Sequence, residues 1–169
     1  MPEALLESAE RSLADHAAFE EREEAYVVTT TPFDATVRVD AAGEALLYEV
    51  SVTVPTLDAT VADEEVAPVV QEGWFETFER RIEHPGSATR VDPGSPLVTL
   101  DLESGAVHVE IGFETTAPAR GADDAKALVD FVEGTYVQGI VPGYEYRDPV
   151  AGLIQQAEDR SKGAGGPPI

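Results

Sequence analysis

Two stretches of the chain alternate between apolar and polar residues, and each predicts a β-hairpin. Residues 33–39 and 48–54 place apolar side chains at every second position, with the turn DAAGE between them. Residues 98–102 and 107–113 repeat the pattern around the turn ESGA. Alternation of period two is typical of antiparallel strands that bury one face and expose the other. The sequence therefore predicts an antiparallel sheet with one covered face.

Apolar residues recur at helical spacing in three longer segments. This periodicity predicts amphipathic helices over residues 3–23, 63–83 and 123–138. The second segment contains Pro68, so this helix either begins near the proline or has loosely formed first turns.

Shorter signals complete the pattern. The run YVVTTTPF (residues 26–33) is rich in β-branched residues, and its proline predicts an edge strand or a bend. ATRVD (88–92) predicts a further short strand. Asp148 followed by Pro149 predicts the start of a last short helix. Residues 161–169, which are rich in glycine and proline, predict a flexible tail.

These elements predict a single α+β domain over residues 1–160, followed by the tail. Their order, α-ββ(β)-α-ββ(β)-α-α, favours an antiparallel sheet of about five strands with the helices packed on one face. A chain of 169 residues is long enough to bury a core without disulfides, and it contains no cysteine.

The charge is strongly acidic and is spread along the whole chain. There are 33 acidic and 11 basic residues, which give a net charge of −22, and only Lys126 and Lys162 among the cations are lysines. Carboxylate-rich, lysine-poor surfaces are typical of proteins from halophiles, where molar salt shortens the Debye length to about 3 Å and screens the repulsion. We expect solvated K⁺ or Na⁺ to associate with this surface without specific sites.

The same composition argues against several partners. The cations form no basic stripe, so we expect no nucleic-acid binding. No apolar run reaches the ~18 residues that a membrane span requires. The first residues lack the basic and apolar regions of a signal peptide, so we expect a cytoplasmic protein.

Motifs for catalysis or for binding metals and cofactors are missing from the sequence. There is no HExxH, no phosphate-binding loop, no GxSxG and no GxGxxG. For His16, at the border of the first helix, we expect a backbone or carboxylate partner. We therefore predict no catalytic residue, no metal and no cofactor.

The best candidate for a binding surface is the aromatic segment YVQGIVPGYEYRDP. It holds Tyr136, Tyr144 and Tyr146, with Pro142 and two glycines between them and Gly134 just before them. Tyrosine offers a large amphipathic contact at low entropic cost, which suits recognition. The alternative is that these rings pack the last helix onto the sheet.

A second concentration of large side chains lies in GWFETFERRIEHPG, which contains the only tryptophan. Trp74, Phe78 and Ile82 fall four residues apart, which favours a buried stripe on a core helix. A pocket between this helix and the sheet would be an alternative, with Trp74, Arg80 or Arg81, and His108 or Glu110 nearby.

Three segments, TTTPFDATVRV, EGWFETFERRIEHP and FVEGTYVQGIVPGYEYRDPV, carry a family resemblance. In this order, on an acidic chain of this length, they resemble a family of small uncharacterised proteins from halophilic archaea. The resemblance covers nearly all of the chain except the tail. Because that family is of unknown function, it implies no activity and no catalytic residues.

The sequence thus favours a non-enzymatic protein-binding or adaptor domain of a halophile's cytoplasm, which binds a protein partner or a second copy of itself. The alternative is a small-molecule-binding protein or a carboxylate-based hydrolase that uses the pocket between the sheet and the second helix.

Overall fold

The alternating segments pair as predicted and build one antiparallel sheet of six strands. The structure is a computed structural model that describes residues 2–164. The strands are β1 (Phe19–Glu21), β2 (Tyr26–Val28), β3 (Asp34–Ala42), β4 (Ala45–Pro55), β5 (Leu97–Asp101) and β6 (Ala106–Thr115), in the spatial order β1-β2-β3-β4-β6-β5. The α+β class and the two hairpins are confirmed, with six strands in place of about five.

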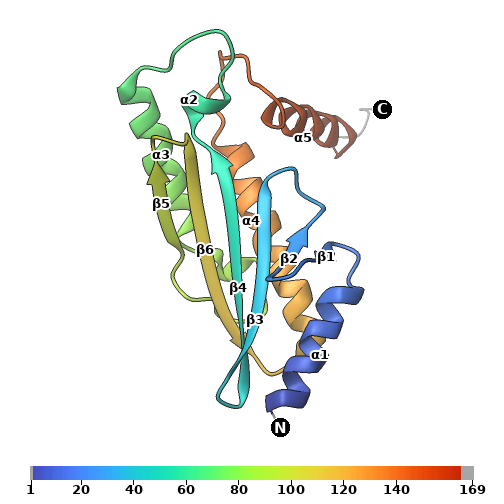
Figure 1. Cartoon of the computed structure of the whole chain (residues 1–169). Helices are drawn as coiled ribbons and strands as arrows, with labels where there is room; N and C mark the ends of the chain where they lie inside the picture. The colour runs from blue at the N-terminus through green and yellow to red at the C-terminus, as the bar shows by residue number, and fades with distance from the viewer. Residues whose placement is uncertain (1, 165–169) are drawn as a thin grey trace.

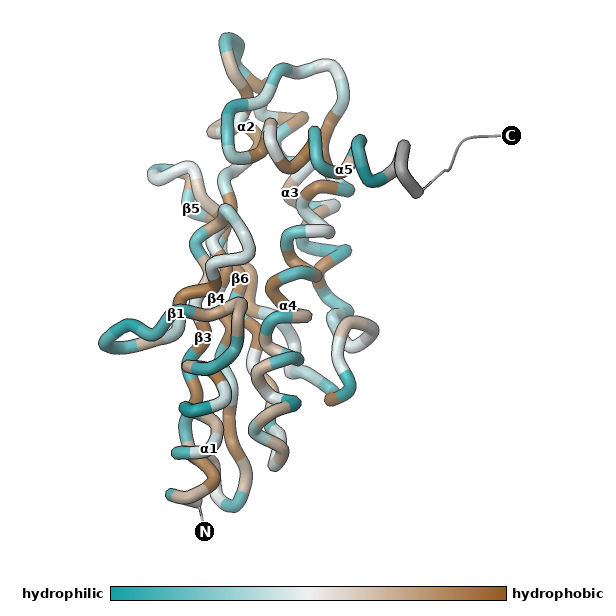
Figure 2. The backbone as a smooth tube through the Cα atoms, turned by 90° about the vertical axis from the view of Figure 1, so that its right-hand side faces the viewer, coloured by the Kyte–Doolittle hydropathy of each residue, from teal (hydrophilic) through white to brown (hydrophobic). Residues whose placement is uncertain are grey.

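The helices form a second layer on one face of the sheet. They are α1 (Pro2–Asp15), α2 (Leu57–Thr60), α3 (Pro68–Ile82), α4 (Pro118–Gln138) and α5 (Val150–Ala164), with a 3₁₀ turn η1 (Pro85–Ser87). Figure 1 shows the sheet in front with α3 and α4 behind it. Figure 2 gives the side view, in which the strands and these two helices are separate layers. Within residues 2–164, the other face of the sheet carries no helix.

The first helix ends eight residues earlier than the sequence predicts, at Asp15 instead of residue 23. The imidazole of His16 stops it, because Nδ1 accepts a hydrogen bond from the Ala18 backbone N–H at 3.1 Å and Nε2 lies 2.9 Å from an Asp123 oxygen. The chain then turns into β1, whose Phe19 pairs with Val28. The predicted partner for His16 is confirmed, and the predicted helix beyond Asp15 is wrong.

Other boundaries differ by less. The helix α3 begins at Pro68, which confirms the later of the two predicted starts. The predicted strand at 88–92 is absent, and these residues form turns. The helix α4 begins at Pro118, five residues before the predicted start. The helix α5 continues to Ala164, and the rest of the predicted tail lies outside the described residues.

The core lies between the sheet and the helix layer. Tyr48 from β4 is fully buried, stacks on Phe113 at 5.0 Å between centroids, and donates a hydrogen bond to the Pro118 carbonyl at 3.2 Å. Tyr136 from α4 is fully buried as well, and its hydroxyl donates to the Pro55 carbonyl at 3.0 Å. Both tyrosines therefore join the two layers through a ring and a hydrogen bond.

We expect these two phenols to make the fold sensitive to alkaline pH. Burial raises the pKa of Tyr48 from 10.0 to about 12, and burial also raises the pKa of Tyr136. Because the folded pKa exceeds the unfolded value, the contribution is complete below about pH 10 and is lost as pH rises through about 12. Phenolate absorbance should therefore rise in two steps, the second together with a change in Trp74 fluorescence.

A Tyr48→Phe variant is the control, and the pH midpoint of its alkaline unfolding should move upward. Titration of all the tyrosines in a single step near pH 10, with the fold retained, would contradict the expectation.

Candidate binding groove

The tyrosines predicted as a binding surface do not form one patch. Tyr136 is in the core, where its ring lies edge-on to Phe33 at 5.1 Å, Trp74 at 5.8 Å and Phe78 at 6.0 Å. A fully buried ring has no surface to offer a partner. The alternative prediction was that these rings pack the last helix onto the sheet; the Tyr136 ring does serve packing, but it joins α4 to α3 and to the end of β4.

Tyr144 and Tyr146 are half-buried and lie edge-to-face, with centroids 6.5 Å apart. The Tyr146 hydroxyl donates to the Val141 carbonyl. The backbone around them is fixed to the residues after α2, because Arg147 N–H donates to the Thr60 carbonyl at 2.7 Å. Of the three tyrosines, only these two therefore offer aromatic surface, and each offers only part of its ring.

The other candidate residues lie in three separate places. Trp74 is 4% exposed and stacks on Phe78 inside the helix layer. Arg80 is exposed near the end of α3. His108 is exposed on β6, with its Nδ1 2.9 Å from the Thr53 hydroxyl oxygen.

His108 cannot share a site with the helix layer. The neighbouring Val107 and Val109 of β6 are buried beneath the helices, so His108 and Glu110 point to the opposite, open face of the sheet. Trp74, Arg80 and His108 are therefore not brought together.

A groove does lie between the sheet and α3, but other residues form it. Its volume is about 560 Å³. Its apolar surface comes from Val66, Pro68 and Phe75 on the α3 side and from Leu100 and Leu102 at the end of β5. Leu102 is 68% exposed, so the groove adds accessible apolar surface that a partner can cover.

Hydrogen bonds from α2 fix one end of this α3–β5 groove. The Asp58 carboxylate accepts from the Val66 backbone N–H at 3.0 Å, and the Gln71 side-chain oxygen accepts from the Asp58 backbone N–H at 3.0 Å. On the β5 side, hydrogen bonds from the Ser104 side chain and backbone lower the pKa of Asp101 and fix the turn that carries Leu102. The groove is therefore preformed by local contacts.

The rim of the groove is acidic. Asp58, Glu65, Glu72 and Glu76 line it, and no lysine, arginine or histidine does. Among the residues that the structure describes, no cation lies within 4.0 Å of Glu65, Glu72 or Glu76. The groove therefore has an apolar surface with unpaired carboxylates at its rim. This combination suits a ligand that carries both apolar and positively charged groups.

A larger groove, of about 630 Å³, lies beside the β1–β2 turn, but it is less suited to a charged ligand. Arg22 and Arg38 line it together with several carboxylates, and Arg22 is already 2.5 Å from Glu20. These two arginines would repel a positively charged ligand. The α3–β5 groove is therefore the better candidate.

Sequence reasoning placed a pocket between the sheet and the second helix but missed the residues that line it. One signal was available: Phe75 lies off the stripe of Trp74, Phe78 and Ile82, so it had to project from another side of α3. The contribution of Leu102 could not be found this way, since its alternation predicted a buried strand residue.

Comparison with known proteins gives a family and no function. A model described as "Family of unknown function (DUF5813)" matches residues 14–156, which is most of the chain. No curated protein and no solved structure matches the chain. Within residues 2–164, no helix combines the length and the apolar character that crossing a membrane requires.

Proposed function

The chain belongs to the family of unknown function DUF5813, and from its geometry we propose that it is a non-enzymatic domain that binds another protein. The α3–β5 groove is the docking site. Its partner contributes a segment that combines apolar residues with lysine or arginine.

The observation that carries this proposal is the pairing of an exposed apolar wall with an uncompensated acidic rim. Leu102 and Phe75 give the groove apolar surface that loses contact with water when a partner covers it. Glu65, Glu72 and Glu76 attract a cationic partner and reject an acidic one. The apolar surface of the groove contributes affinity, and the acidic rim contributes selectivity between cationic and acidic partners.

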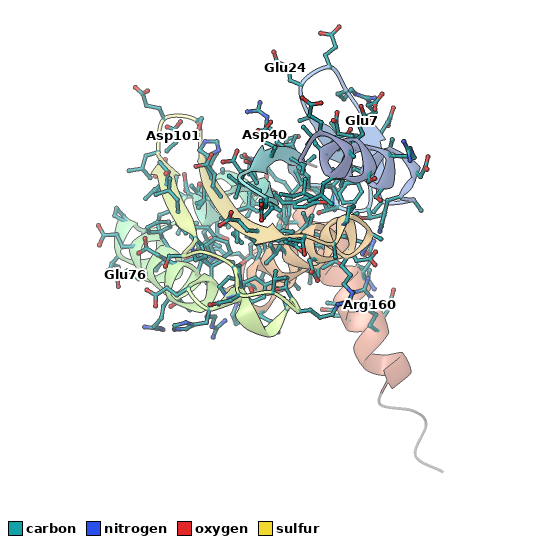
Figure 3. All side chains as sticks on the ribbon, turned by 90° about the horizontal axis from the view of Figure 1, so that it is seen from below. Glu7, Glu24, Asp40, Glu76, Asp101 and Arg160 are labelled. Carbon is teal, nitrogen blue, oxygen red and sulfur yellow. The ribbon has the colours of Figure 1, made fainter. Side chains whose placement is uncertain are left out.

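The acidity of the whole surface supports a halophilic setting, which we propose to be the cytoplasm of a halophilic archaeon. Figure 3 shows acidic side chains projecting from several elements along the top and left of the view, where Glu7, Glu24, Asp40, Glu76 and Asp101 are labelled. In molar salt the Debye length is about 3 Å, so only charges in close contact contribute to binding. A rim that surrounds the docked segment meets that requirement.

Selection of displayed random peptides against the protein in molar KCl tests the proposed function. We expect enrichment of peptides that contain both apolar and basic residues. Binding of these peptides should fall by at least about tenfold in Leu102→Glu, because a charge replaces the exposed apolar wall. It should fall similarly when Glu72 and Glu76 are both replaced by Lys.

Val69→Glu is the matched control for the selection experiment. Val69 lies on α3, is 73% exposed and does not line the groove, so this variant should bind as the wild type does. Enriched peptides without basic residues, or peptides whose binding survives both groove variants, would refute the proposed docking site.

The size of the groove also favours a second candidate function, the binding of a small molecule. Its volume of about 560 Å³ falls in the range of roughly 300–1,000 Å³ found for small-molecule sites. The same apolar surface and acidic rim would select an amphiphile with a cationic group. Displacement of a selected peptide by a long-chain alkylamine, at concentrations that leave the Leu102→Glu variant unaffected, would favour this alternative.

A further inference from the structure

The two edges of the sheet differ in how well they are protected against pairing with another strand. The edge strand β1 has three residues, two of which are Glu20 and Glu21. Short edge strands that carry charges discourage the addition of further strands. The β1 edge is therefore protected.

The opposite edge strand, β5, has none of these protections over its first four residues. Its sequence is LVTLD, it contains no proline and no lysine, and its register with β6 runs without a bulge from Leu97 to Asp101. Leu97 is 59% exposed, and Val98 and Leu100 are half-buried. An apolar edge of this kind is the type to which other strands add.

The outward backbone groups of β5 are free to pair. In an antiparallel ladder every second residue of an edge strand directs its N–H and C=O away from its partner. Among the described residues, β5 makes no backbone hydrogen bond outside its ladder with β6. The edge therefore presents a row of unpaired donors and acceptors.

The free edge lies at the mouth of the α3–β5 groove. Leu100 and Leu102 of the groove wall come from the end of β5 and the turn after it. The beginning of α3 lies beside this end of β5 (Figure 1). A strand placed alongside β5 would direct alternate side chains toward the helix layer and into the groove.

We propose that the partner binds as a seventh strand beside β5, which deepens the proposed function and rests on it. The bound segment is extended and about as long as β5, and the alternate residues that face the groove include both apolar and basic side chains. Backbone hydrogen bonds to β5 give affinity, and the side chains that enter the groove give specificity. Apolar side chains contact Phe75 and Leu100, and lysine or arginine side chains reach Glu72 and Glu76.

Charge argues against a second copy of the chain as this strand. Each copy carries a net charge of −22, and two copies joined at β5 would bring two acidic rims together. Like charges in close contact oppose association even when salt screens longer distances. A basic segment from another protein meets the rim with opposite charge.

The probe for strand addition is a peptide in which serine alternates with valine or lysine, so that valine and lysine share one face of the strand. Two further versions carry N-methyl groups on alternate residues, one on the odd positions and one on the even positions. An added strand directs only one of these two sets of N–H groups toward β5. We expect one methylated version to lose at least about tenfold in affinity and the other to bind as the unmodified peptide does.

Backbone amide exchange provides a second measurement that needs no variant. Binding of the unmodified peptide should slow the exchange of amides in β5 and leave those in β1 unchanged. Equal binding by both methylated versions, or unchanged exchange in β5, would overturn strand addition.

The outcomes separate the two proposals. If the unmodified peptide binds, loses affinity in Leu102→Glu and tolerates both methylations, the groove stands and strand addition is refuted. If the probe peptide does not bind at all, strand addition is refuted, and the displayed-peptide selection decides the docking site independently.

Discussion

The Gly121→Ala variant should lose about 3 kcal/mol of folding free energy, through one added methyl group. Gly121 lies on α4 directly over the buried ring of Tyr48, and a Cβ built there would come 2.5 Å from Cε1 and closer still to Cζ. That ring is stacked on Phe113, and its hydroxyl donates a hydrogen bond to the Pro118 carbonyl. The ring therefore cannot move without losing both contacts. Thermal unfolding followed by Trp74 fluorescence measures the loss as a drop of roughly 6 to 12 °C.

Gly134 supplies the matched control within the same helix. A Cβ there meets nothing within 4 Å, so Gly134→Ala should raise stability by about 0.5–1 kcal/mol. Tyr48→Ala removes the ring with which the new Cβ would clash. Adding Gly121→Ala to that variant should therefore lower the free energy of unfolding only slightly. If Gly121→Ala costs as much in that background as in the wild type, the ring is not the cause.

Transfer from about 2 M to about 0.1 M KCl should lower the unfolding midpoint by about 10 °C or more. The chain carries 33 acidic residues against 11 basic ones, and five ion pairs are found among the described residues. Most of the negative charge is therefore unpaired, and its repulsion opposes the compact state when salt is removed.

Two controls separate screening from other effects of salt. Sucrose stabilises folded proteins without screening charge. Adding sucrose at low salt should therefore not restore the unfolding midpoint that is reached in KCl. Replacing Glu23 and Glu24 by glutamine removes two charges from the exposed β1–β2 turn, and this should raise stability more in low salt than in high salt. Equal midpoints at both salt concentrations would contradict the halophilic interpretation.

The sequence predicted the parts of the fold that depend on periodicity. The register of β3 with β4 and of β5 with β6 follows the predicted alternation, and the burial of Trp74, Phe78 and Ile82 follows the predicted helical stripe. Period and burial are linked directly, since a residue on the wrong face would expose an apolar side chain.

Features that depend on single contacts could not be predicted in the same way. The helix α1 ends because the His16 imidazole accepts from a backbone N–H, whereas the apolar pattern alone continued the helix through Ala17. The groove depends on where α3 crosses β5, and no local pattern specifies that crossing. His108 and Glu110 lie on the open face of the sheet, and their separation from α3 follows only from the one-sided helix layer.

The unequal edges of the sheet also limit how large an assembly can grow. Head-to-tail polymerisation through strand pairing requires two receptive edges on each molecule. Here β5 is apolar and open, whereas β1 is three residues long and carries Glu20 and Glu21. A molecule that binds one strand at β5 has no second receptive edge to which a further strand can add. The complex should therefore contain one partner per molecule and should not extend into a fibre.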